Sequence, residues 1–227
     1  MIYTFWEGEM PDYISMCFDT WKGNFTILTY RDLESIGIDK DKLNPFSLPQ
    51  IADIVRAHVL YHNGGVWLDA DTIMLTGELP EENLLGYPDR RDATVGYLRT
   101  EAHSDFYREW VKYQDEMINR VNETKKVQWD EACYKFTDPY VKSHKEITIG
   151  DIENRWVETY MIKSNAERHL KYKQFYFKDK YKLSDIRPTD IIMLHNSWTP
   201  EWYRYASRTR ILESDCTLSN IFKEVLK

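Results

Sequence analysis

A short hydrophobic segment that runs directly into two aspartates constrains this chain more than any other feature. The run from Val66 to Leu68 reads as a buried strand, and Asp69 and Asp71 follow it with one alanine between them. Residues i and i+2 of an extended chain point the same way, so the two carboxylates share one side. Carboxylate oxygens suit Mg²⁺ or Mn²⁺ and leave coordination positions open for phosphate oxygens. The motif therefore predicts a metal and ligand site at the carboxyl end of a strand.

The residues before this motif predict a helix with a carboxylate and a guanidinium on one face. Apolar residues recur at helical spacing from 50 to 62, and two glycines at 64–65 end the pattern. Asp53 and Arg56 lie three positions apart, so they share a helix face. Taken alone, the pair is also typical of an exposed ion pair of little energetic value. Its spacing from the two aspartates favours a ligand site.

Strand and helix patterns alternate along the chain and predict an α/β fold with a mostly parallel central sheet flanked by helices. We expect one domain over residues 1–227, with a peripheral tail from about residue 210. The other expected elements are strands at 2–6, 25–30, 172–177 and 191–194, short strand pieces across 72–98, helices at 11–21 and 104–119, and the end of a helix after 129 followed by a loop at 137–139.

Charge and composition exclude several classes of protein. The net charge of −7 disfavours nonspecific binding to nucleic acid, and it requires that a cation neutralise any phosphate ligand. The three cysteines are too few and too widely spaced for a disulfide framework or a zinc site. No apolar run approaches the roughly 20 residues of a membrane span. The N-terminus lacks the features of a signal peptide, so we expect a cytoplasmic protein.

The stretch from Ala52 to Asp71 closely resembles the DXD sugar-binding region of GT-A glycosyltransferases, whose fold is Rossmann-like. The groups it most resembles are the family 32-like sugar transferases, which include capsule and lipopolysaccharide enzymes. It is also similar to the core of the large clostridial glucosylating toxins. Weaker similarity covers residues 2–11 and the C-terminal element 195–198, and residues 136–140 resemble the family's Thr-Gly-Pro segment with Asp138 in place of the usual glycine.

The resemblance implies a binding site for a nucleotide-sugar donor. Aromatic residues of the first strand would flank the base, the helix pair would hold sugar hydroxyls and phosphate, and the C-terminal element would touch the diphosphate. Of these residues, Asp69, Asp71 and Arg56 would act in catalysis. The implied donor-binding residues are Phe5, Trp6, Asp53, Arg56, Asp69, Ala70, Ser197 and Trp198.

The resemblance also implies a Mn²⁺ or Mg²⁺ cofactor. Asp71 would be its direct ligand, Asp69 would bind the metal, ribose or sugar, and His195 or Asn196 would supply a second protein ligand. An imidazole is a reasonable ligand for Mn²⁺, although a histidine after an apolar strand is also typical of a hydrogen-bonded core residue. Trp6 on the first strand is equally consistent with a core position.

Together these implications predict a metal-dependent hexosyltransferase. It would move a hexose from a nucleotide diphosphate sugar, with UDP favoured, to a saccharide or glycan hydroxyl, retaining the anomeric configuration. The alternatives are a noncatalytic nucleotide-sugar or saccharide-binding module and a metal-dependent nucleotide-sugar hydrolase. A basic cluster of Arg204, Arg208 and Arg210 would hold diphosphate or a peripheral membrane surface, or would form a solvated face.

Overall fold

The computed structural model describes residues 1–227, and the chain forms two compact units, each discontinuous in sequence. The division separates the two aspartates of the motif, because Asp69 belongs to unit 1 and Asp71 to unit 2. The expectation of one domain over the whole chain stays a prediction. Unit 1 comprises Met1–Gly8, Gly23–Asp69 and Glu81–Asp151, and unit 2 comprises Glu9–Lys22, Ala70–Pro80 and Ile152–Lys227.

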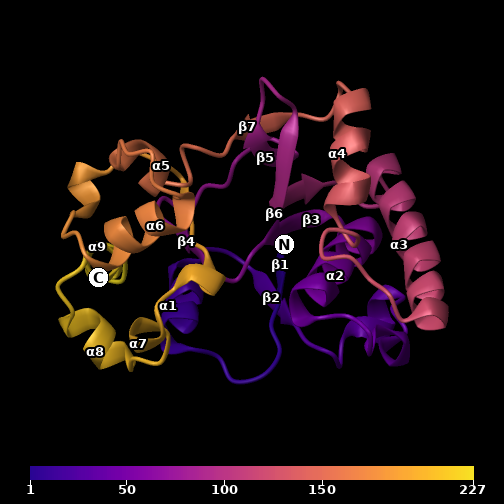
Figure 1. The fold of residues 1–227 in the computed structure, drawn as a ribbon, viewed down its shortest axis with the longest axis horizontal. Helices are drawn as coiled ribbons and strands as arrows, with labels where there is room; N and C mark the ends of the chain where they lie inside the picture. The colour runs from indigo at the N-terminus through magenta and orange to yellow at the C-terminus, as the bar shows by residue number, and fades with distance from the viewer. The chain divides into compact units, whose positions relative to one another are not determined.

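Unit 1 is built on a six-stranded sheet with the order β2-β1-β3-β6-β5-β7 (Figure 1). β1 pairs in parallel with β2 and β3, β5 pairs in parallel with β7, and β6 runs antiparallel to both of its neighbours. Five strands therefore share one direction, and the predicted α/β fold with a mostly parallel sheet is confirmed. The strands are β1 Ile2–Phe5, β2 Phe25–Leu28, β3 Gly65–Leu68, β5 Leu84–Tyr87, β6 Asp92–Thr100 and β7 Ile149–Asp151.

Three helices of unit 1, α2, α3 and α4, gather beside this sheet in Figure 1. α2 begins with a capping box between the N-cap residue Ser47 and Gln50, a pairing that stabilises the start of a helix. Its buried residues recur at helical spacing and pack into the core of unit 1. The helical segments are α2 Leu48–Asn63, α3 Asp105–Thr124 and α4 Tyr134–Ser143, with the short 3-10 helices η1 Leu33–Ile36 and η2 Lys40–Leu43.

The double glycine between α2 and β3 is required by the backbone. Gly64 and Gly65 have φ angles of 62° and 97°, in the left-handed region that L side chains rarely adopt. A Cβ atom on Gly64 would lie 2.5 Å from the amide nitrogen of Ala102, and one on Gly65 would lie 2.6 Å from the carbonyl oxygen of Met1. The two glycines thus let β3 start directly after α2, and Asp69 follows the last residue of this short strand.

Unit 2 contains a two-stranded antiparallel sheet and most of the short helices. β4 pairs with β8, with Thr72 opposite Met193 and Met74 opposite Ile191. The strands are β4 Thr72–Met74 and β8 Ile191–Met193, and the helices are α1 Asp12–Thr20, α5 Glu158–Met161, α6 Arg168–Phe177, η3 Leu183–Asp185, η4 Asn196–Trp198, α7 Glu201–Arg204, α8 Arg208–Glu213 and α9 Thr217–Val225.

Two of the expected elements differ in the structure. Residues 172–177 lie in helix α6, not in a strand, because Tyr172, Phe175 and Tyr176 are fully buried and repeat at helical spacing. The predicted loop at 137–139 is also wrong, since α4 continues through Pro139. The prolyl ring follows the first turn of α4, and the helix accommodates it without ending there.

The segment beyond residue 210 contributes to the core of unit 2 through α9. Leu218, Ile221 and Phe222 are fully buried, and the phenolic oxygen of Tyr203 lies 3.2 Å from the hydroxyl of Ser219. This tail is thus packed into unit 2. No helix is both long enough and apolar enough to cross a membrane.

Candidate functional site

Arg56 organises a buried polar cluster in unit 1 at the end of β3. Its Nη2 lies 3.1 Å from Oδ1 of Asp53 and 3.2 Å from Oδ1 of Asp69. Nη1 donates to the carbonyl oxygen of Val95, and Nε donates to that of Ala52 at 3.3 Å. The side chain is only 6% exposed, so the alternative of a solvated helix ion pair does not describe it. Arg56 instead joins the helix carboxylate to the first aspartate of the motif.

Asp69 is oriented from three sides within unit 1. Its backbone N–H donates to the carbonyl oxygen of Gly96, which continues the pairing of β3 with β6. The indole N–H of Trp67 donates to Oδ1 at 2.9 Å, and the Arg56 guanidinium lies 5.0 Å from the centre of the Trp67 ring. The Asp69 side chain is nevertheless 37% exposed. The carboxylate is therefore fixed in direction and accessible to a ligand.

The charges in this cluster depend on one another. Burial raises the pKa of Asp53 to about 6, against the lowering effect of Arg56 and of a hydrogen bond from the Cys133 thiol. Burial alone would lower the pKa of Arg56, but the carboxylates of Asp69 and Asp53 outweigh it and raise that pKa. One guanidinium thus serves two carboxylates, and the cluster carries a net negative charge when all three groups are ionised.

Asp71 joins a different network, in unit 2. The backbone N–H of Asn196 donates to its Oδ2 at 2.6 Å, and its own carbonyl oxygen accepts from the backbone N–H of Leu194 at 3.0 Å. The phenol of Tyr13 donates to Oδ1 of Asn196. Because β4 follows Asp71 and pairs with β8, the strand register brings Asp71 to the start of η4.

The charge of Asp71 affects three buried groups of unit 2, namely Tyr13, Cys17 and Tyr172. Burial raises the pKa of Tyr13 and of Cys17, and the charge of Asp71 raises both further. Burial also raises the pKa of Tyr172, again with a contribution from Asp71. The Tyr13 phenol therefore stays protonated at neutral pH and remains a hydrogen-bond donor to Asn196.

His195 lies directly after β8, as predicted, and contacts charged side chains of unit 2. Nη2 of Arg168 lies 2.8 Å from its Nε2, and Oε1 of the fully buried Glu158 lies 3.7 Å from the same nitrogen. The Arg168 guanidinium also lies 3.3 Å from the centre of the Trp156 ring. Because Arg168 donates to Nε2, that nitrogen acts as an acceptor here. The metal-ligand role of His195 stays a prediction.

The remaining residues of the C-terminal element form η4. Ser197 is exposed, Trp198 is half-buried, and the Trp198 ring lies 4.1 Å from the imidazole of His195. Arg204 donates from Nη2 to the carbonyl oxygens of Asn196 and Thr199. Arg204, on helix α7, thus stabilises η4 by hydrogen bonds to its backbone. The sequence did not predict this structural role for a residue of the basic cluster.

Phe5 ends β1 and Trp6 directly follows it, and the two aromatic side chains differ in exposure. Phe5 is 7% exposed and packs edge-on against Tyr30 in the core of unit 1. Trp6 is half-buried, and its indole N–H has no hydrogen-bond partner. Of the pair, Trp6 therefore has the geometry better suited to a ligand contact, and the role of both at the nucleotide base stays a prediction.

The structure therefore gathers the predicted site residues within each unit. In unit 1 it joins Asp53, Arg56 and Asp69, and in unit 2 it joins Asp71 to Asn196. Sequence reasoning missed the side chains that hold them, because these contacts join distant parts of the chain or carry no motif. The missed residues are Tyr13, Trp67, Glu158 and Arg168.

The oxygen donors of the motif suit a hard cation. No group of three His, Cys, Asp or Glu side chains forms a metal cluster in the structure. A Mg²⁺ ion that also binds phosphate needs only one or two protein carboxylates. Both close contacts of Asp69 fall on Oδ1, and the carboxylate keeps an exposed surface. Asp69 in unit 1 and Asp71 in unit 2 each offer carboxylate oxygens that suit such an ion.

Comparison with known proteins identifies the family. The family model described as capsular polysaccharide synthesis protein matches residues 2–183, so the chain belongs to that family. This confirms the resemblance to capsule enzymes found in the sequence. No protein of curated function matches the chain significantly. Six chains of solved structures do, among them "PaToxG Glycosyltransferase", with a TM-score of 0.44 and 14% identity over 63% of this chain and 67% of that one.

Proposed function

We propose that this protein is a metal-dependent hexosyltransferase of polysaccharide synthesis. It takes a hexose from a nucleotide diphosphate sugar, with UDP as the favoured nucleotide, and transfers it to a saccharide hydroxyl with retention of configuration. Membership of the capsular polysaccharide synthesis family supports a role in building glycans. The single observation that carries the proposal is the buried cluster in which Arg56 holds Asp53 and Asp69 at the end of β3.

In this proposal the cluster of unit 1 orients the donor. The guanidinium of Arg56 contacts Asp69 and the backbone of Val95, so Arg56 acts by orienting Asp69 at the strand end. The exposed surface of the Asp69 carboxylate then accepts hydrogen bonds from donor hydroxyls. Trp6 directly follows β1, is half-buried, and contributes an aromatic face for the base.

In unit 2, Asp71 and the element at 195–198 are the residues proposed to bind the metal and the diphosphate. A bound Mn²⁺ or Mg²⁺ supplies electrostatic stabilisation of the charge on the departing diphosphate. Asp71 is the proposed principal ligand, and the backbone N–H of Asn196 keeps its carboxylate in one orientation. Ser197 is exposed on η4, where its hydroxyl is available to the diphosphate.

The test is a turnover assay with a panel of nucleotide sugars and Mn²⁺, with and without saccharide acceptors. Release of nucleoside diphosphate that requires an acceptor, and that stops with EDTA, supports transfer. Release without an acceptor identifies a hydrolase, and tight binding without turnover identifies a binding module. Full turnover in metal-free buffer contradicts the proposed metal dependence.

A further inference from the structure

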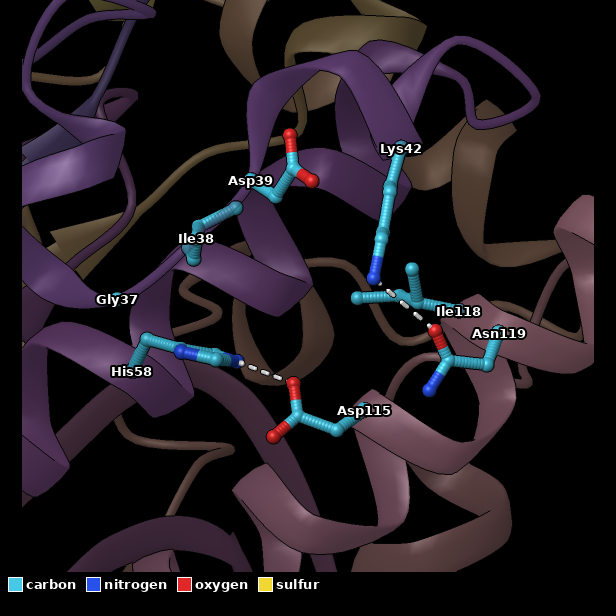
Figure 2. A pocket seen from close by; sticks show the side chains of 8 residues that line it. All are labelled: Gly37, Ile38, Asp39, Lys42, His58, Asp115, Ile118 and Asn119. Atoms are coloured by element: carbon cyan, nitrogen blue, oxygen red, sulfur yellow. Dashed lines mark hydrogen bonds and ion pairs between the residues drawn. The ribbon is translucent and has the colours of Figure 1, made fainter.

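A polar cavity lies in unit 1 beside helices α2 and α3, where no proposed donor residue reaches (Figure 2). Its volume is about 310 Å³, which is at the small end of the range for ligand pockets. α2 contributes one lining side chain, α3 contributes three, and the segment from η1 to η2 contributes the rest. The lining residues used below are Ile38, Asp39, Lys42, His58, Asp115 and Asn119.

His58 lines this cavity, and both of its ring nitrogens are buried without a hydrogen-bond partner. The residue is only 2% exposed, and neither Nδ1 nor Nε2 has a hydrogen-bond partner. The nearest charged atom, Oδ1 of Asp115, is 3.9 Å from Nε2, which is too far for a hydrogen bond. The backbone of Ile36 lies near the ring but outside hydrogen-bond geometry. A buried polar group without a partner is costly, so this imidazole points to a ligand.

We propose that the cavity binds a neutral saccharide unit of monosaccharide size through its hydroxyl groups. A hydroxyl both donates and accepts, so it complements an imidazole that offers one donor and one acceptor. The carboxylates of Asp39 and Asp115 accept from further hydroxyls, and the ammonium of Lys42 and the amide of Asn119 donate to others. Ile38 adds an apolar surface for the C–H face of a sugar ring.

The charges around the cavity disfavour phosphate and nucleotides as ligands. Burial lowers the pKa of His58 to about 4, so the imidazole is neutral near pH 7. The two carboxylates then outnumber the single ammonium of Lys42, which disfavours phosphate and nucleotides. Lys42 donates to Oδ1 of Asn119 at 3.3 Å, as Figure 2 shows. A metal ion finds no cluster of three ligands here.

The cavity is separate from the cluster around Arg56, although both use α2. Residues 56 and 58 are two positions apart, and each residue of an α-helix turns by about 100°, so their side chains leave the helix about 160° apart. His58 therefore faces the cavity while Arg56 faces the end of β3. Saccharide binding in the cavity needs neither the metal nor the nucleotide, and this inference does not depend on the proposed transfer reaction.

Saturation-transfer-difference NMR with glucose, galactose, mannose and N-acetylglucosamine, in buffer containing EDTA, tests the proposal. We expect at least one of these sugars to bind and Asp115→Asn to weaken that binding at least tenfold. Asp115 is exposed on α3, so its substitution should leave the fold intact. Glu116→Gln, an equally conservative change at the adjacent exposed residue outside the cavity, should leave binding unchanged.

Two further measurements make the result decisive. The imidazole resonances of His58 should shift as the sugar is added, and Asn119→Ala should repeat the loss seen with Asp115→Asn. The proposal is overturned if none of the four sugars binds, or if Asp115→Asn and Glu116→Gln have equal effects. Loss of binding in Asp69→Asn but not in Asp115→Asn would place the sugar at the donor site and would also overturn it.

Discussion

Asp69 in unit 1 and Asp71 in unit 2 are two positions apart in the chain, yet the protein holds them by different means. Asp69 is held by a buried guanidinium that it shares with Asp53, whereas Asp71 accepts a hydrogen bond from the backbone N–H of Asn196. A guanidinium partly offsets the charge of the carboxylates that it orients. A backbone N–H orients a carboxylate and adds no net charge.

This difference indicates separate tasks for the two aspartates. A carboxylate that is already compensated by arginine is suited to hydrogen bonds with neutral hydroxyls, because its charge is partly balanced. The Asn196 N–H orients the Asp71 carboxylate without adding charge, and carboxylate oxygens are ligands that suit a hard cation. In the proposed reaction, Asp71 is the principal metal ligand and Asp69 contacts the sugar or ribose.

Removing the guanidinium should have the largest effect. Arg56→Ala leaves Asp53 and Asp69 without their buried cation, so we expect a loss of about 3–5 kcal/mol in the free energy of unfolding. Arg56→Lys should recover only part of it, since an ammonium cannot contact both carboxylates in the same planar arrangement. Urea denaturation followed by circular dichroism measures both. Arg90→Ala, which breaks an exposed ion pair with Asp92, is the control and should cost less than about 1 kcal/mol.

The next effect concerns the charge of Asp71. Asp71→Asn keeps an oxygen acceptor for the Asn196 N–H and removes the negative charge, so the fold should survive while kcat falls by about 10²–10³-fold. Nucleoside diphosphate release in the presence of Mn²⁺ measures the change, and Asp89→Asn on an exposed turn is the matched control. Transfer at the wild-type rate by Asp71→Asn would show that Asp71 is not the metal ligand.

A smaller effect comes from the raised pKa of Asp53. Its value of about 6 in the folded chain exceeds its ordinary value of 3.8, so the folded state binds this proton more tightly. The corresponding stability is fully present below about pH 4 and is lost as pH rises to about 6, by about 3 kcal/mol. Asp53→Asn should therefore flatten the pH dependence of the unfolding free energy in this window. Identical slopes for the wild type and the variant would contradict the assignment.

The smallest effect is expected from the hydrogen bond between Tyr13 and Asn196, next to Asp71. Tyr13→Phe removes the phenol that donates to Asn196, which should cost about 1 kcal/mol of stability and lower transfer only a few-fold. Thermal unfolding and the transfer assay measure the two consequences. Tyr205→Phe removes a phenol from a side chain that is 78% exposed and should change neither. A loss from Tyr13→Phe as large as that from Arg56→Ala would remove the contrast between the two networks.

The local patterns predicted most of unit 1 correctly. Strand β3, helix α2 and the glycines between them follow from hydrophobic periodicity and from backbone chemistry, and both act over a few residues. The grouping of Asp53, Arg56 and Asp69 follows as well, because a helix face and a strand end determine it. The aromatic run at 172–177 misled the prediction, since its residues are compatible with both periods and only packing in unit 2 selects the helix.

The contacts that hold Asp71 and His195 were beyond local reasoning. Tyr13 and Asn196 are 183 positions apart, and no pattern near either residue indicates the other. Glu158 and Arg168 lie on separate short helices, α5 and α6, and meet beside His195 only after unit 2 has folded. Whether a histidine after a strand is a ligand or a packed residue depends on such distant partners.

The interleaving of the two units bears on how the protein can be dissected. Each unit draws on three segments of the chain, so no single cut releases either of them intact. The family match ends at residue 183, before β8, which is the only pairing partner of β4. A fragment trimmed to that match would leave the fully buried Ile73 without its partner strand. It would also lack the donor of the hydrogen bond to Asp71, so such a shortened protein should aggregate and should not report on activity.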